Sequence, residues 1–190
     1  LRVVNLSLGF AEQFPILGQP DLPMADEVLL HRSPAVRASF EALAERDVSI
    51  VAAAHNMYRD IDDTPAHAMY PAAFELPGLI GVGGISRRGT WFGNRGRRTV
   101  DVVAPAADVI SPAVGPDLAL MAHLVDPTRR MRPDTPPFDR LPRGEGTSQA
   151  TAYVSTVVAL MRAHEATAEL DAAAIRRRLI ASSTNSAWSR

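Results

Sequence analysis

The sequence has 190 residues, of which 46% are hydrophobic and 22% charged, and this is enough to bury one compact core. Its 20 basic and 21 acidic residues leave a formal net charge of -1, so no overall basic field exists to attract nucleic acid or an anionic membrane. The absence of cysteine excludes disulfides and thiolate metal sites, and no apolar run approaches the roughly 20 residues that span a bilayer.

Five short apolar runs rich in β-branched residues predict strands. They lie at residues 1–6, 48–54, 79–84, 100–104 and 109–110. Continuous apolar strands that alternate with helical patterns predict a mostly parallel sheet with helices on both faces. We therefore expect an α/β fold.

Three segments have the residue spacing of amphipathic helices. The first has an apolar face made of Val36, Phe40, Leu43 and Ala44. The second begins at Ser148, and we expect it to bury a face made of Ala150, Val154, Val157, Val158 and Met161. The third is expected over residues 170–180, with Asp171 at its start and one stripe made of Ile175 and Leu179.

Two proline-rich stretches interrupt this alternation and are predicted to be surface insertions, at residues 11–34 and 112–144. The second stretch is also rich in arginine. A solvated loop is the favoured interpretation, and a loop that regulates or docks a partner is the alternative.

Residues 144–161 read GEGTSQATAYVSTVVALM, in which a small, flexible lead runs directly into an apolar helical pattern. Ser148 lies at the start of this helix, where free backbone N–H groups and the helix dipole favour developing negative charge. That position suits a nucleophile. Serine is also a preferred N-cap residue, so the segment alone favours a polar helix cap and leaves a nucleophile open.

The run SIVAAAHN, at residues 49–56, ends an apolar strand on Asn56. Functional sites of α/β folds assemble at the carboxyl ends of strands. An asparagine amide there can stabilise an oxyanion, but asparagine is also a common turn residue. Neither interpretation is decided by this run alone.

Five segments taken in chain order resemble the second half of a subtilisin-like serine protease, a member of the subtilase family. They are VVNLSLG (3–9), VAAAHN (51–56), YPAAFELPGLIGVGGIS (70–86), VDVVAPAADVIS (100–111) and GTSQATAYVSTVVALM (146–161). The resemblance implies a three-layer, subtilisin-like α/β architecture that is incomplete at the N-terminus. It also implies that residues 1–190 are the carboxyl-terminal part of one catalytic domain.

The resemblance implies roles for individual residues of a serine endopeptidase. Ser148 corresponds to the nucleophile, and Asn56 corresponds to the asparagine that supplies the oxyanion-hole amide. The residues expected to bind substrate are Ser7, Leu8, Gly9, Ala53, Ala54 and His55. The implied partner is a polypeptide substrate, and the implied location is secreted or extracytoplasmic. No cofactor is required, and although subtilases often bind calcium for stability, no ligand set for calcium is readable.

Several residues depart from the family pattern. His55 stands where the family has glycine, so its side chain must either point away from the specificity pocket or narrow it. After the nucleophile, Gln149 and Tyr153 replace the methionine and histidine that are usual in the family. The change at His55 leaves the substrate preference open, and the changes after the nucleophile are interpreted as tolerated variation. Ala106, which replaces a glycine usual in the family, and the long excursion at 112–144 indicate a divergent branch.

The family order along the chain is Asp, His, Ser, and no motif for the first two is present in the 190 residues. None of the histidines sits in a fitting motif: His31, His55, His67, His123 and His164. A serine without a base is a weak nucleophile near neutral pH. We therefore expect a fragment that is inactive alone and whose missing amino-terminal part carries the aspartate and histidine. A catalytically inactive subtilase-like domain used for binding or structure is the alternative.

Two further patterns point to other functions. Three acidic residues, Asp60, Asp62 and Asp63, lie near His67, but their spacing matches no familiar metal-ligand set and indicates a solvated loop. The glycines at 81, 83 and 84 resemble part of a dinucleotide-binding loop, but the third glycine of that fingerprint is missing. A metal site and a nucleotide-binding domain are therefore weaker hypotheses.

Overall fold

The fold is built on a five-stranded sheet, as a computed structural model describes it. Its strands are β1 (Val3–Leu6), β5 (Ser49–Ala53), β7 (Leu79–Ile85), β8 (Trp91–Phe92) and β9 (Val102–Pro105). The structure describes residues 2–11, 13–14, 22–23, 33–110, 143–164, 167 and 169–183. Four of the five predicted strands lie in this sheet, with bounds that differ by a few residues.

Three of the four strand pairs in the central sheet are parallel. β5 pairs with β1 and with β7, and β7 pairs with β9, all in parallel register. Only β8 runs antiparallel to β7. The prediction of a mostly parallel sheet is confirmed.

Three pairs of two-residue strands lie outside the central sheet. β10 (Val109–Ile110), the fifth predicted strand, pairs with β11 (Arg143–Gly144). β2 (Phe10–Ala11) pairs with β6 (Met69–Tyr70), and β3 (Gln13–Phe14) pairs with β4 (Leu22–Pro23). Most residues of the two predicted surface insertions, 11–34 and 112–144, lie outside the described part of the chain.

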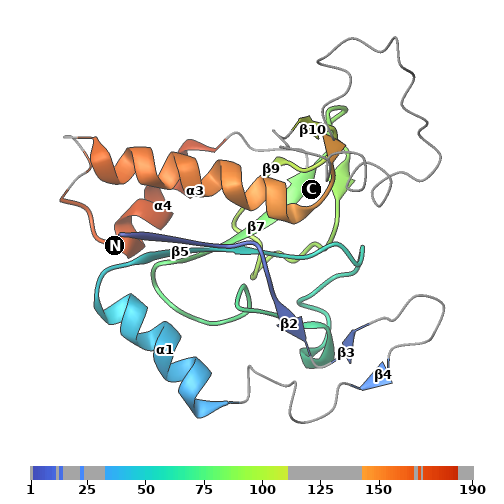
Figure 1. The fold of residues 1–190 in the computed structure, drawn as a ribbon, viewed down its shortest axis with the longest axis horizontal. Coiled ribbons are helices and arrows are strands. Elements are labelled where there is room, and N and C mark those ends of the chain that lie inside the picture. Colours follow the sequence, from blue (N-terminus) through green and yellow to red (C-terminus); the bar gives the residue numbers. More distant parts are fainter. Residues whose placement is uncertain are drawn as a thin grey trace, which may run out of the picture.

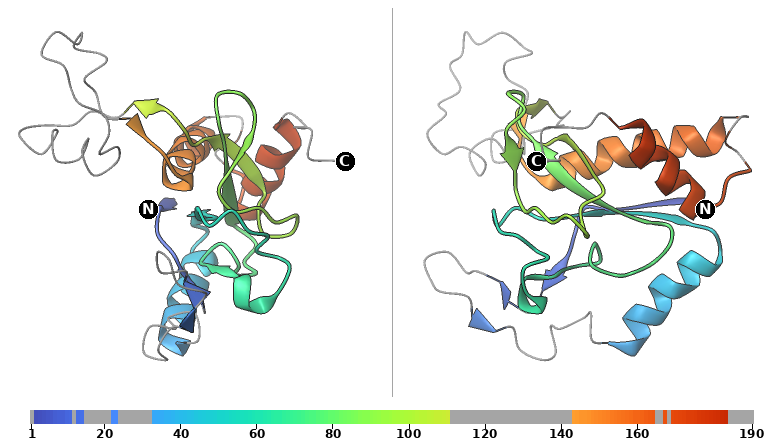
Figure 2. Two further views of the ribbon diagram at one scale, coloured as in Figure 1. Left: turned by 90° about the vertical axis from the view of Figure 1, so that its right-hand side faces the viewer. Right: turned by 180° about the vertical axis from the view of Figure 1, so that it is seen from behind.

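Helices cover both faces of the sheet (Figures 1 and 2). α1 (Pro34–Glu45) lies on one face, and α3 (Thr147–Ala163) and α4 (Ala172–Ser182) lie on the other. A short 3₁₀ helix, η3 (Pro65–His67), lies in the connection between β5 and β6. The predicted three-layer α/β arrangement is thus confirmed.

Successive residues of each strand contribute to opposite layers of the core. Ile50 and Leu79 pack with Phe40 and Leu43 of α1. On the opposite face lies a larger apolar cluster with α3 and α4, which includes Val51, Ile80, Val82, Val154, Val158, Ile175 and Leu179. Because both faces are covered, the strands of the central sheet are mostly apolar.

The starts of α1 and α4 are set by side-chain caps. The Ser33 hydroxyl accepts from the Val36 N–H at 3.5 Å, and Asp171 Oδ1 accepts from the Ala174 N–H at 2.6 Å. Asp171 thus begins the last helix as predicted. The predicted stripe of Ile175 and Leu179 is buried.

The prediction that Val157 of α3 is a core residue is wrong. Ala150, Val154 and Val158 are buried, but the Val157 side chain is 44% exposed. The buried stripe of α3 follows a spacing of four residues, and Val157 lies at its border rather than on it. Within the described part of the chain, no helix has the length and the apolar character needed to cross a membrane.

Candidate active site

Three segments that are far apart in the sequence meet where α3 begins (Figure 1). Ser7 directly follows β1, Asn56 lies three residues after the end of β5, and Ser148 is the second residue of α3. Hydrogen bonds join them: the Ser7 hydroxyl donates to the Ser148 carbonyl at 3.0 Å, and Asn56 binds Thr147. The structure therefore brings together the two predicted catalytic residues and the predicted substrate-binding strand.

Asn56 caps α3 from outside the helix. Its Oδ1 accepts from the Thr147 backbone N–H at 2.9 Å and from the Thr147 hydroxyl at 3.1 Å. Since Oδ1 is occupied in this way, the orientation of the amide is set by the network. Its Nδ2 donates to no other described residue, and this nitrogen lies near Gly146, which directly precedes the helix.

The Ser148 side chain does not cap the helix, so the helix-cap interpretation is wrong. Gly146 is the N-cap residue, with φ 147° and ψ 156°, a backbone conformation open essentially only to glycine. The Ser148 hydroxyl instead donates to the Ser7 carbonyl at 3.3 Å. Ser148 is half-buried, and its backbone N–H belongs to the first turn, where such groups lack an intrahelical acceptor.

A chain of hydrogen bonds supports Ser148 from the neighbouring strand. The Ser155 hydroxyl donates to Asn5 Oδ1 at 2.8 Å, and Asn5 Nδ2 donates to the Ser7 hydroxyl at 3.0 Å. That hydroxyl donates in turn to the Ser148 carbonyl. Polar side chains therefore join β1 to α3, and two of them, Asn5 and Ser155, were not singled out by the sequence patterns.

The segment at residues 7–9 presents an exposed, extended edge. It lies between β1 and β2 and belongs to neither strand, and the Leu8 side chain is 52% exposed. Free backbone groups on an exposed edge can pair with an added peptide strand. A role for Ser7, Leu8 and Gly9 in binding substrate stays a prediction.

The other predicted substrate-binding residues differ in exposure. Ala53 is 2% exposed and Ala54 is fully buried, so these two side chains support the strand end from within the core. Ala54 packs with Ile61 and Met69. His55, in contrast, is only half-buried and lies against Gly9. The surface available to a ligand on this strand end is therefore made by His55 and Asn56.

Asn94 organises the loop that carries Asn56, and the sequence analysis missed it. Its side chain is fully buried; Nδ2 donates to the Ala54 carbonyl at 2.7 Å, and Oδ1 accepts from the Met57 and Arg59 N–H groups. Its own N–H donates to the His55 carbonyl at 2.8 Å. These contacts join residues about forty positions apart in the sequence. The local sequence shows only an asparagine that follows Gly93, whose φ in the structure is 80°.

His55 combines two unusual features. Its backbone has φ 71°, a left-handed conformation that favours glycine, and its Nε2 is buried without a hydrogen bond among the described residues. Burial lowers the pKa of His55, and the nearby Leu8 carbonyl, which favours the protonated ring, offsets only part of this effect. The ring at the site is therefore held in its neutral form.

The described histidines do not supply a base to Ser148. The Ser148 hydroxyl has the Ser7 carbonyl as its hydrogen-bond partner within the described ranges. His164 lies at the opposite end of α3, and His67 lies in η3. His31 and His123 fall outside the described residues.

The acidic cluster is engaged by groups of the chain itself. The Asp62 carboxylate accepts from the Arg98 N–H and the Thr99 hydroxyl, and Asp60 accepts from the Asp62 N–H and faces Arg95 at 3.8 Å. Within the part of the chain that the structure describes, no three histidine or acidic residues gather as a metal site would need. The carboxylates therefore tie loop segments together.

The glycines at 81, 83 and 84 lie inside β7 and not in a loop. A Cβ on Gly81 would come within 1.8 Å of the Thr99 carbonyl oxygen, so this residue allows a close approach of two backbones. The nucleotide-binding hypothesis is wrong for this motif, since a phosphate-binding loop needs free N–H groups at a helix start.

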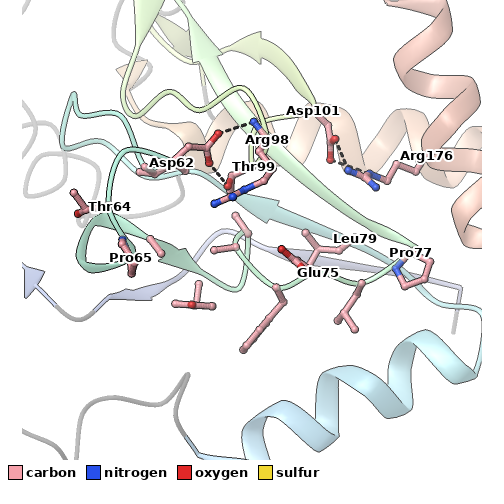
Figure 3. A pocket seen from close by; sticks show the side chains of 17 residues that line it. Asp62, Thr64, Pro65, Glu75, Pro77, Leu79, Arg98, Thr99, Asp101 and Arg176 are labelled. Atoms are coloured by element: carbon pink, nitrogen blue, oxygen red, sulfur yellow. Dashed lines mark hydrogen bonds and ion pairs between the residues drawn. The ribbon is translucent and has the colours of Figure 1, made fainter.

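A pocket of about 650 Å³ opens elsewhere on the molecule (Figure 3). Asp101 and Arg176 lie on its wall and form an ion pair of 2.6 Å, and Asp101 also accepts from the Gly81 N–H. Ser148, Asn56 and His55 do not line it. Asp101 and Arg176 are thus paired with each other, and the residues that line the pocket do not include those at the start of α3.

Comparisons with known proteins show which family model the sequence matches and which solved structures have a similar fold. The sequence model of the subtilase family matches residues 1–190. A search of curated proteins finds no match to the sequence. The fold is similar to that of a cold-adapted subtilisin-like serine proteinase, with 22% identity, a TM-score of 0.60, and coverage of 97% of this chain and 49% of that one.

Two other solved structures are similar to the same extent. One is a serine-to-alanine mutant of the protease domain of PatA, with 22% identity, a TM-score of 0.61, and coverage of 98% and 53% of the two chains. The other is the A-subunit of the AB5 toxin from E. coli, with 21% identity, a TM-score of 0.57, and coverage of 96% and 52%. The chain thus spans about half the length of the structures it resembles.

Proposed function

This chain belongs to the subtilase family of serine proteases, and from that membership we propose that it carries the nucleophile and the oxyanion-binding amide of a serine endopeptidase. Ser148 is the proposed nucleophile, and Asn56 is the proposed oxyanion donor. One observation carries the proposal: Asn56 Oδ1 is bound to Thr147, beside Ser148, while Nδ2 has no partner among the described residues. An amide held in this way has a donor directed at the start of α3.

In the proposed reaction, Ser148 Oγ attacks the carbonyl carbon of a peptide bond and forms a tetrahedral intermediate. The negative oxygen of the intermediate accepts from the Asn56 amide and the Ser148 backbone N–H. Donors that are already aimed at this oxygen need no reorganisation when the charge develops, and they lower the barrier for that reason. The dipole at the start of α3 acts in the same direction.

The attack requires a base that takes the Ser148 proton. In this family a histidine oriented by an aspartate performs this role, and both precede the serine in the chain. The described residues place only the Ser7 carbonyl against the Ser148 hydroxyl. We therefore propose that the histidine and aspartate belong to another part of the catalytic domain, and that the 190 residues alone do not hydrolyse peptides.

The proposed substrate is a polypeptide in extended conformation. Its backbone pairs with the exposed edge at residues 7–9, as in the addition of a strand to a sheet. Support comes from the exposure of Leu8 and from the absence of residues 7–9 from the described ladders. The chemistry needs no cofactor, since a hydroxyl and two amide groups carry it together with the base.

Labelling by a fluorophosphonate probe tests the proposal. We expect the full-length protein to be labelled on Ser148, with the site identified by peptide mass spectrometry, and Ser148→Ala to lose the label. Thr156→Ala is the matched control, because it removes a hydroxyl at an exposed position of the same helix, where the hydroxyl donates to the Ala152 carbonyl, and it should keep the label. Labelling elsewhere, or none in a protein that carries the upstream aspartate and histidine, would refute the proposal.

A second candidate is a catalytically inactive subtilase-like domain that binds polypeptides. The specific observation in its favour is His55, whose ring occupies space beside Gly9 that the family leaves open. A full-length sequence in which either triad partner is replaced, together with an unlabelled Ser148, would favour this candidate.

A further inference from the structure

The His55 ring fills the space between the two segments that border the proposed substrate. A Cβ built on Gly9 would lie 1.8 Å from His55 Nε2 and 2.6 Å from the Tyr70 carbonyl oxygen. The imidazole therefore lies directly against the Gly9 backbone. His55 Nε2 has no solvent-exposed surface and makes no hydrogen bond within the described residues.

This space is the one that a substrate side chain would enter. In the proposed reaction the reacting carbon lies between Ser148 Oγ and Asn56 Nδ2, and the proposed pairing with residues 7–9 holds the peptide that precedes it. The side chain just before the cleaved bond then points between Gly9 and the residue adjacent to Asn56 in the chain. That residue is His55.

Resting on the proposed endopeptidase function, we propose that His55 closes this pocket and restricts the residue before the cleaved bond to glycine, alanine or serine. A longer substrate side chain would have to displace the imidazole. The ring resists displacement because it is packed against Gly9 and lies near Tyr70. A large substrate side chain before the cleaved bond is therefore accommodated at a cost in free energy, and a small one is not affected.

The local structure supports a role for the side chain itself. At φ 71° the backbone of residue 55 would be relaxed by glycine, and a glycine would also remove the buried nitrogen that lacks a hydrogen bond. Both features cost stability. Burial that lowers the pKa of His55 keeps the ring neutral, which suits an apolar filling of the pocket.

Hydrolysis of a matched peptide series by the full-length protein tests the inference. The peptides are internally quenched and differ only before the cleaved bond, which carries Gly, Ala, Leu or Phe. We expect kcat/KM for the Ala peptide to exceed that for the Phe peptide by about a hundredfold or more. His55→Gly should raise kcat/KM for the Phe peptide by at least about tenfold. One methylene group that a pocket accepts or excludes changes kcat/KM by about 10- to 200-fold.

Two further variants separate pocket filling from backbone strain. His55→Asn retains a smaller polar side chain that tolerates positive φ, so its Ala-to-Phe ratio should lie between those of wild type and His55→Gly. Asp108→Gly is the matched control, because Asp108 also has a positive φ, of 58°, at an exposed position. This change should leave the ratio unaltered.

The outcomes distinguish the two proposals. Equal cleavage of the Ala and Phe peptides by wild type, or an unchanged ratio in His55→Gly, would overturn the role of His55 if Ser148 is still labelled by the fluorophosphonate. No cleavage and no label in any variant would overturn the endopeptidase function, and the role of His55 with it.

Discussion

Helix α3 has very different surroundings at its two ends. At the amino-terminal end, polar groups are left without partners. Three buried side-chain atoms lack a hydrogen bond within the described residues, and two of them, His55 Nε2 and Gln149 Oε1, lie here. Asn56 Nδ2 is a further donor without a partner in that part of the chain.

At the carboxyl-terminal end, the network is complete. Arg162 is buried, and each nitrogen of its guanidinium donates: to the Asp47 carboxylate and carbonyl, to the Ser49 hydroxyl and to the Leu170 carbonyl. Asp47 Oδ1 also accepts from the Ala172 N–H at 2.6 Å. The network thus ties α3 to β5 and to the start of α4.

The contrast separates two uses of polar residues on one helix. Satisfied buried groups stabilise the fold, because breaking such a network leaves donors and acceptors without partners. Unsatisfied groups cost stability and are retained where a ligand completes them. The satisfied buried groups around Arg162 therefore have a structural role. The unsatisfied groups around Ser148 support a binding site there.

The largest effect on activity, after removal of Ser148, is expected at Asn56. Asn56→Asp keeps the acceptor that caps Thr147 but removes the Nδ2 donor and adds a negative charge. We expect kcat/KM of the full-length protein to fall by roughly a hundred- to thousandfold, the loss that removal of one oxyanion donor causes in subtilisin. Asn56→Ala removes both functions, so it should also lower the melting temperature, and Asn56→Asp should not.

Activity retained in Asn56→Asp, or equal losses of stability in the two variants, would show that Asn56 acts only as a helix cap. That result would remove the functional contrast between the two ends of α3.

The next largest effect is expected on stability at Arg162. Arg162→Ala strands the Ser49 hydroxyl and two carbonyls, so we expect the free energy of unfolding to fall by about 3 kcal/mol, measured by urea denaturation. The fluorophosphonate label on Ser148 should persist under folding conditions, because residue 162 lies about 20 Å further along the helix. Arg178→Ala, at an exposed position of α4, should change the stability by less than about 0.5 kcal/mol.

An unfolding free energy that is unchanged in Arg162→Ala would mean that the network is dispensable. A selective loss of the Ser148 label with stability intact would mean that the two ends are coupled through α3.

The smallest effect concerns the pH dependence of stability. Because the pKa of His55 is lowered in the folded protein, the unfolded chain takes up the proton first as the pH falls. The unfolding free energy of wild type is therefore unaffected by this group above about pH 6.5 and decreases as the pH falls through the lowered pKa. The unfolding free energies of wild type and His55→Asn should run parallel above pH 7.5, and that of wild type should fall relative to that of His55→Asn below pH 6.5.

If the two stability curves stay parallel down to pH 5, the imidazole is not held neutral in the pocket. The amino-terminal end of α3 would then be less tightly closed than the structure indicates.

Much of the fold follows from patterns along the chain. The strands of the central sheet other than β8 were predictable because both faces of the sheet are covered, so these strands are mostly apolar. The start of α4 was predictable because Asp171 is a local cap. The prediction for Val157 was wrong because the predicted five-residue apolar face of α3 is wider than the stripe of this helix that the sheet covers. Arg162 carried a usable signal, since it continues the buried spacing of Val154 and Val158 by four residues.

The site was less predictable, because its contacts join distant parts of the chain. Asn56 and Thr147 are 91 residues apart, and Ser7 and Ser148 are 141 residues apart. No local pattern shows that Asn56 caps α3 in place of Ser148. The order of five family segments supplied the pairing that spacing alone did not, and it left open which way His55 points.

A crystal structure of the full-length protein with a peptide boronate that ends in boroalanine tests the central claim most directly. We predict a tetrahedral boron bonded to Ser148 Oγ, with one of its oxygens about 3 Å from both Asn56 Nδ2 and the Ser148 backbone nitrogen. A boronate bound elsewhere, or one on Ser148 whose oxygens face away from Asn56, would contradict the assignment of this end of α3 as an oxyanion site.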